Sequence, residues 1–390
     1  MLSSLALAAH TPPPRGAADT VIRVLYYLGL SSAAGLGLTL GALAPSRASG
    51  GLVAARTQRL ALVVAAFVAV TAVLDFVSQA ARTGHTSPYR AADPHELSVF
   101  VHAPASRGDV IGNGVVTLAQ MGVYAALILA IIAVHLRANR IGGWLVFVLA
   151  MITAVLPIMP FHRATVDATA RAVLTATHVV GGLTWVGGLV FLAVLGIAGL
   201  VGPHGRRDLA IGDNALQLAA DWTQIWRRFS TIALFAVGAV LLSGSWLAWT
   251  HVATPAEMFT TTYGRYLTIK LVMVVLMLAS GAYNVRVLLP RIRAARAADD
   301  TATVLRIATH RFPKVVAAEA VLAIGVLTVV PFLMGSARMQ AGVPSARPFD
   351  LTVFGIGLIL LVLIAAALWA GTRVPRLLPR RRTHSSNPAS

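Results

Sequence analysis

The chain contains no cysteine and little charge. Without thiols it can form no disulfide, thiolate metal site, iron–sulfur cluster or catalytic cysteine. Only 12% of its 390 residues are charged, and of its 32 basic residues only Lys270 and Lys314 are lysines. This composition, with 57% hydrophobic residues and a mean hydropathy of +0.76, excludes an ordinary soluble domain and predicts an all-α, polytopic membrane protein.

Several functional signatures are also missing. Residues 1–20 lack the basic start and long apolar core of a cleavable signal peptide. We find no ATP-binding loop, phosphorylated-aspartate motif, hydrolase signature or kinase signature, so we expect no enzyme and a transport that is passive or driven by an ion gradient. The net charge of +18 lies between hydrophobic runs, which indicates an anionic lipid bilayer as the partner and no nucleic acid.

Apolar runs of about 20 residues predict nine membrane helices. Arginines concentrate in alternate connections, which predicts the N-terminus outside and the C-terminus inside. The connection 203–228 is predicted to form a short interfacial amphipathic helix from Asp208 to Trp226. The predicted spans are 21–43, 59–82, 112–136, 141–160, 169–202, 226–250, 265–289, 313–336 and 350–372.

These spans suggest three parts. Residues 1–160 form a four-helix membrane region with a long outer loop at 83–111. Residues 161–336 form a second membrane domain of four helices. Residues 337–390 supply the final helix and a basic tail, which we expect to be disordered.

The second domain opens with a long apolar run that carries His178, Trp185 and two glycine pairs. At helical spacing His178, Gly181, Gly182, Trp185 and Gly188 fall on one face, so a neighbouring helix can approach closely. His178 lies about 14 Å along the helix from Thr169, a costly depth for an imidazole and therefore a candidate functional position. The alternative is a histidine that only packs against a neighbouring helix.

Methionine and histidine are distributed unevenly across the predicted topology. All eight methionines after the initiator fall in the outer half of the membrane or in outer loops, and most histidines fall on the same side. Thioether and imidazole ligands without thiolates suit copper, especially Cu(I), better than zinc, iron or magnesium. Methionine is also a common packing residue in membrane helices, which is the alternative for Met273 and Met277.

Further candidate ligands lie toward the outer surface. Asp93-Pro-His-Glu96 predicts a helix start, after which His95 and His102 share a face. Three histidines in a solvated loop also arise by chance, so a metal role for them stays open. The remaining outer candidates are Met159 and His162, one turn apart, and His251.

Three ionisable residues in the apolar runs, together with Trp185, are the supporting candidates. Asp75 near the outer end of the second span is predicted to pair with Lys270, and Glu319 with inner basic residues such as Arg286. Trp185 would close the path beneath His178. Both charge pairs can equally serve structure alone.

The fifth to eighth predicted helices resemble the copper resistance D (CopD) family of bacterial inner-membrane proteins. The resemblance covers roughly residues 170–336. It lies in His178 with Trp185-Val-Gly-Gly188, Arg228-Phe-Ser230, Ser243-Gly244, Thr262-Tyr-Gly-Arg265, Lys270, Asn284, and Phe312 through Glu319.

That resemblance implies copper movement across the plasma membrane, which we take as uptake, beside a CopC-like periplasmic copper protein acting in trans. Two alternatives remain at this point: a membrane haem or quinone protein for respiratory-enzyme assembly, and a non-transporting scaffold that docks a copper chaperone. A bis-histidine haem needs two embedded histidines at matching depth. Only His178 is well inside, with His135 near the opposite surface.

Overall fold

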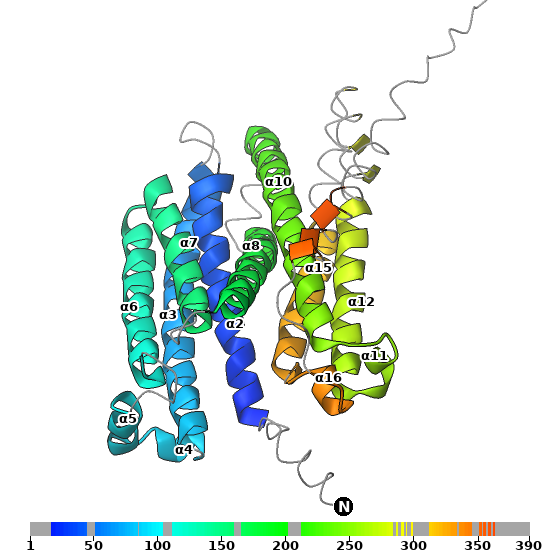
Figure 1. Ribbon diagram of the computed structural model, residues 1–390. Helices are drawn as coiled ribbons and strands as arrows, with labels where there is room; N and C mark the ends of the chain where they lie inside the picture. The colour runs from blue at the N-terminus through cyan, green and yellow to red at the C-terminus, as the bar shows by residue number, and fades with distance from the viewer. Residues whose placement is uncertain are drawn as a thin grey trace, which may run out of the picture. The chain divides into compact units, whose positions relative to one another are not determined.

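The computed structural model describes residues 17–44, 51–84, 86–103, 111–159, 165–201, 212–283, 312–333 and 335–344, with single positions between 286 and 298 and between 351 and 362. These residues form helices joined by short connections (Figure 1), which confirms the all-α membrane class. The chain divides into two compact units, Met1–Pro348 and Phe349–Ser390. The ninth predicted helix, 350–372, and the basic tail lie largely outside the described residues.

Among the described residues of the first unit, eight helices are long and apolar enough to cross a membrane. The first runs from α2 directly into a π-helical turn, η1, at Thr39–Leu43. The helices are α2 (Ala17–Leu38), α3 (Gly51–Thr83), α6 (Asn113–Leu136), α7 (Arg140–Val155), α8 (Val166–Val201), α10 (Gly212–His251), α12 (Thr262–Tyr283) and α15 (Phe312–Val329).

Short elements connect or end these spans. The α5 helix begins where the sequence predicts, because the Asp93 side chain accepts a hydrogen bond from the His95 backbone N–H and Pro94 occupies the first turn. The short elements are α4 (Pro88–Ala91), α5 (Pro94–Val101), η2 (Leu156–Ile158), α11 (Glu257–Thr260), η5 (Val330–Phe332) and α16 (Ala337–Gln340).

Helix α8 occupies the centre of the first unit. It packs against α2 on one side and against α10 and α15 on the other (Figure 1). Helices α2, α3, α6 and α7 contact one another in the N-terminal region, and α12 contacts α15. The helix that carries His178 therefore joins the N-terminal region to the C-terminal helices.

Glycines allow this close packing. A Cβ on Gly187 of α8 would lie 2.5 Å from the Ser31 carbonyl oxygen of α2, and one on Gly181 would lie 2.9 Å from the Ala236 carbonyl oxygen of α10. The predicted close approach is thus confirmed at Gly181, on the α10 side, while Gly187, outside the predicted strip, gives a second close approach on the α2 side. Gly182 has no heavy atom within 4 Å of its Cβ position, so it takes no part.

The predicted interfacial helix is wrong for residues 212–226. These residues are the first part of α10, one continuous helix that extends to His251. No proline occurs between Gly212 and His251, so nothing in the backbone ends the helix where its composition turns from polar to apolar.

Candidate functional site

His178 lies on α8, 12 residues and about 18 Å from the start of the helix at Val166. Its ring is partly buried against α10, where Nδ1 lies 3.2 Å from the Ser243 Oγ. A Cβ on the next residue, Gly244, would lie 3.0 Å from the ring Cε1. The imidazole is therefore held in a contact between two membrane helices.

Lys270 approaches the same ring from α12. It is close enough to interact electrostatically with His178, and the described residues give its amine neither a hydrogen bond nor an ion pair. The predicted pair between Lys270 and Asp75 is not formed, because Asp75 pairs with Arg23. The pair was predicted only because Lys270 and Asp75 lie at similar depths in their predicted membrane spans.

The two candidate methionines of α12 differ in their surroundings. Met273 follows Lys270 by one turn, and its Sδ would lie 2.9 Å from a Cβ on Gly325 of α15. Met277 is 2% exposed and belongs to the hydrophobic core. Met273 therefore lies on the side of α12 that faces the helix packed against α8, while Met277 is a core residue.

The predicted placement of every methionine in one half of the membrane stays a prediction. The candidate span of α12, Thr262–Tyr283, ends where the described residues end, and positions 286 and 287 are again helical, whereas the sequence predicted a span of 265–289. Met334 lies outside the described residues.

The outer candidates do not form one centre in the described residues. His95 and His102 are exposed at the two ends of α5, and the His102 Nδ1 donates to the Ser98 carbonyl oxygen at 2.8 Å. Met159 is half-buried after η2, and its predicted neighbour His162 lies outside the described residues.

His251 ends α10 and is stacked on Tyr263. Their ring centroids are 5.7 Å apart, with an angle of 8° between the planes. The His251 Nδ1 donates to the Leu247 carbonyl oxygen at 2.6 Å, which leaves Nε2 as its unprotonated nitrogen. Across the described part of the chain, no three histidine, aspartate or glutamate side chains gather as a metal site.

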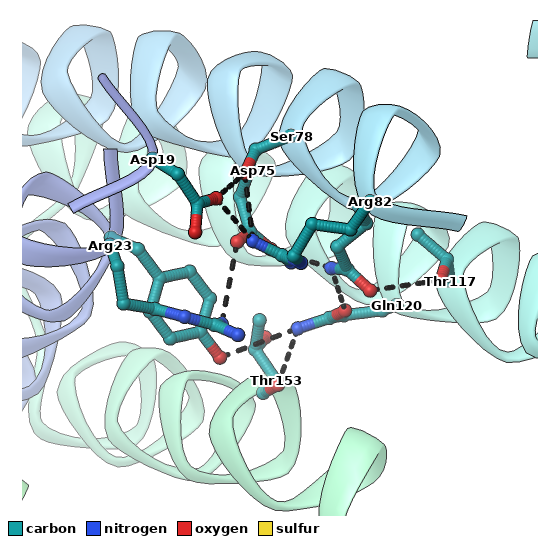
Figure 2. Close-up of polar contacts among 10 residues, drawn as sticks. Asp19, Arg23, Asp75, Ser78, Arg82, Thr117, Gln120 and Thr153 are labelled. Atoms are coloured by element: carbon teal, nitrogen blue, oxygen red, sulfur yellow. Dashed lines mark hydrogen bonds and ion pairs between the residues drawn. The ribbon is translucent and has the colours of Figure 1, made fainter. Parts of the chain in front are cut away.

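The sequence analysis missed most of a polar cluster in the N-terminal region (Figure 2). Asp75 is 1% exposed, and its Oδ1 lies 3.5 Å from the Arg23 Nη1 of α2. Its Oδ2 accepts a hydrogen bond of 2.7 Å from Gln79. The cluster extends over α2, α3, α6 and α7 through Asp19, Ser78, Arg82, Thr117, Gln120, Thr153 and Tyr26.

Part of this cluster was visible in the sequence. Asp75, Ser78, Gln79 and Arg82 recur at spacings that place them on one face of α3. Asp19 was overlooked because the first span was predicted to begin at residue 21, whereas α2 begins at Ala17. Arg23 falls inside the predicted span, but it was not considered as a partner for Asp75. With two carboxylates and two guanidinium groups, the cluster balances its own charge.

Two supporting candidates are buried in the second half of the first unit. Glu319 on α15 is 5% exposed and hydrogen-bonds with the Ser280 side chain of α12. Trp185 on α8 is buried in the hydrophobic core, two turns beyond His178. Glu319 thus links α12 to α15, and Trp185 fills space beside the helix contacts.

Arg228 was named in the sequence only as part of a motif, but its hydrogen bonds connect α10 to the end of η1. Its Nη1 donates to the carbonyl oxygens of Ala42, Leu43 and Ala44, at 3.4, 3.2 and 3.0 Å. Arg140 donates to the Gly41 carbonyl oxygen at 3.2 Å. Two arginines therefore satisfy carbonyl groups at the end of η1, where a helix has no backbone donors left.

A comparison with protein-family models matches residues 223–333 to CopD, described as Copper resistance protein D. The match includes all of α12 and α15 and most of α10, and it begins after α8. No curated protein and no solved structure matches the chain.

Proposed function

We propose that this chain, whose residues 223–333 match the CopD family, moves copper across the bacterial plasma membrane in the direction of uptake. The family match implies a role in copper resistance, and eight candidate spans make the chain a multi-pass membrane protein. Three statements go beyond the family match and belong to our proposal: that the protein transports copper, that it lies in the plasma membrane, and that the transported ion is Cu(I).

The position of His178 carries this proposal. The ring lies well inside the candidate span Val166–Ile197 and contacts α10, which belongs largely to the matched region. An imidazole at this depth is costly unless it has a partner or a ligand. Imidazole nitrogen binds copper well, and in this chain it is the strongest ligand type available within a span.

Met273 is the best candidate for a second ligand. It lies one turn beyond Lys270, which interacts with His178, and its sulfur faces α15, which packs against α8. A thioether favours Cu(I) over harder divalent ions. A protonated Lys270 also repels a divalent ion about twice as strongly as a monovalent one, which again favours Cu(I).

The outer residues would collect the ion before it reaches His178. His251 supports this role best, because its Nδ1–H is bound to a backbone carbonyl and its Nε2 keeps a lone pair. His102 is held in the same way on α5. His95, Met159 and His162 complete the proposed entry, and a CopC-like periplasmic protein would deliver copper in trans.

Copper uptake into proteoliposomes tests the proposal. We expect wild-type protein to take up Cu(I), His178→Ala to lose most of the flux, and Met273→Leu to reduce it severalfold. Leucine has nearly the volume of methionine but no sulfur, so Met273→Leu removes the ligand with little change in packing.

Met151→Leu is the matched control. Met151 is a buried methionine on α7, in the N-terminal region, so its loss removes a sulfur away from His178. Equal flux in wild type and His178→Ala would contradict the proposal, as would purified protein that binds no copper.

One observation disfavours the haem alternative. The His135 Nδ1 lies 2.9 Å from the Gln58 carbonyl oxygen of α3, whereas the His178 ring faces α10. The two histidines therefore face different helices and do not form a bis-histidine pair. A Soret band in the absorption spectrum of the purified protein would favour haem, and copper-chaperone binding without flux would favour a docking scaffold.

A further inference from the structure

The hydrogen bonds of Ser243 determine which nitrogen of His178 carries the ring hydrogen. The Ser243 hydroxyl lies 2.5 Å from the Ala239 carbonyl oxygen, one turn earlier on α10, and 3.2 Å from the His178 Nδ1. A carbonyl oxygen only accepts, so the single hydroxyl hydrogen belongs to the bond with Ala239. The Ser243 oxygen then presents a lone pair to Nδ1, which must carry a hydrogen to bond with it.

A second acceptor, the Val240 backbone carbonyl, also lies within hydrogen-bonding reach of the His178 ring. The contact that identifies Nδ1 is the one with Ser243. Ser243 is fully buried, so solvent does not compete for its oxygen. With hydrogen on Nδ1, the neutral ring keeps its free lone pair on Nε2.

Gly244 allows this contact. A Cβ at that position would lie 3.0 Å from the His178 Cε1 and 3.3 Å from Nδ1, which is tighter than ordinary van der Waals contact. The pair Ser243-Gly244 thus combines an acceptor for Nδ1–H with the space for the ring to reach it.

We propose that Ser243 is a positioning residue that holds His178 in the Nδ1–H tautomer, so that Nε2 is presented to Cu(I). Histidine ligands of metals commonly donate their second ring N–H to a fixed acceptor, and loss of that acceptor typically costs about 10- to 100-fold in affinity. This inference rests on the proposed copper function for its consequence, while the tautomer itself does not depend on copper.

The experiment has two readouts on full-length protein in lipid nanodiscs. The first is the ¹⁵N NMR spectrum of histidine-labelled, copper-free protein, with the His178 signals assigned by their loss in His178→Gln. We expect a protonated Nδ1 and an unprotonated Nε2 in wild type, and a shift toward the other tautomer in Ser243→Ala. The second readout is Cu(I) affinity, measured by competition with a chromogenic chelator.

Ser243→Ala should bind Cu(I) about 10-fold more weakly, and Ser243→Thr should restore both readouts because threonine retains the hydroxyl. Ser245→Ala is the matched control, since Ser245 is an exposed serine on α10 whose hydroxyl donates to the Leu241 carbonyl oxygen. It should change neither readout.

Each adverse outcome has its own meaning. Wild-type protein with the hydrogen on Nε2, or a tautomer that Ser243→Ala leaves unchanged, would overturn the role of Ser243. An altered tautomer with unchanged Cu(I) affinity would overturn it as well. Wild-type protein that binds no Cu(I) would overturn the proposed function.

Discussion

At the scale of single residues, several buried polar groups in this protein have a partner on a neighbouring helix. Asp75 has Arg23 and Gln79, His178 has Ser243, and Glu319 has Ser280. Burying a polar group without a partner costs several kcal/mol, and more in a bilayer where water does not compensate. The partners therefore specify which helices meet and in which register.

The Arg23–Asp75 pair gives a prediction on stability. Asp75→Ala should destabilise the protein, because it leaves the Arg23 guanidinium beside a buried apolar gap. Breaking a fully buried pair costs about 3–5 kcal/mol, and we expect less here because the Arg23 side chain keeps 22% exposure. Unfolding by sodium dodecyl sulfate, followed by circular dichroism, measures the change.

The double variant Arg23→Ala with Asp75→Ala supplies the control. If the pair is coupled, its loss of stability will be smaller than the sum of the two single losses. A strictly additive result would mean that the two charges do not stabilise each other.

The sequence could identify these residues but not their partners. Asp75 and Glu319 stand out because acids are rare in apolar runs, and His178 stands out for the same reason. Their partners come from other helices, and depth along a span allows many pairings. The Lys270–Asp75 pairing was wrong for this reason, since Arg23 on α2 meets α3 directly.

At the scale of elements, glycine contacts determine how α8 packs. Gly35 of α2 would place a Cβ against the Gly187 carbonyl and the Phe191 Cβ, and Gly188 would place one 2.4 Å or more from Phe229. Small residues allow helix backbones to approach closely and gain van der Waals contact in a membrane. Helix α8 uses them toward both α2 and α10.

Two neighbouring glycines test this packing. Gly187→Ala should destabilise the protein by about 1–3 kcal/mol, because its methyl group would lie 2.5 Å from the Ser31 backbone oxygen and force the two helices apart. Gly182→Ala should change stability by less than about 1 kcal/mol, since nothing lies within 4 Å of its Cβ position. Thermal unfolding of both variants in the same detergent gives the comparison.

A Gly182→Ala variant as damaging as Gly187→Ala would show that the effect is a general one of glycine loss. Equal wild-type stability in both would show that the α2–α8 contact can shift without cost.

Helix existence was predictable from hydropathy, while helix ends were not. Eight predicted spans correspond to the eight candidate spans, because a stretch of about 20 apolar residues has few alternatives to a membrane helix. The beginning of α10 depends on where helix breakers lie and on tertiary contacts, and Gly212–Trp226 continues this helix despite its polar composition.

At the scale of the whole molecule, the family-matched region is joined to helices that the match does not include. His178 lies on α8, before residue 223, yet its ring partner Ser243 lies within the match. The α8 helix also packs extensively on α2 of the N-terminal region. The proposed copper site therefore depends on how the two regions are held together, and α8 and Arg228 both make contacts between them.

Arg228 provides the sharpest test of that coupling. Its guanidinium donates to three carbonyl oxygens at the end of η1, so Arg228→Ala should release this end of the first span from α10. We expect a lower thermal unfolding temperature and a reduced copper flux in proteoliposomes, with Cu(I) affinity changed less than the flux. Arg228→Lys should restore little, because an ammonium group lacks the planar fork of donors.

Arg227 is the matched control, since it precedes Arg228 on the same helix and is exposed. Arg227→Ala removes the same charge from the same surface and should leave stability and flux near wild type. If both variants lose flux equally, the positive charge of this surface is what matters. A third result is a loss of flux in Arg228→Ala alone, with an unchanged unfolding temperature. In that case the contact with η1 does more than hold the two regions in place, because it also transmits a movement between them.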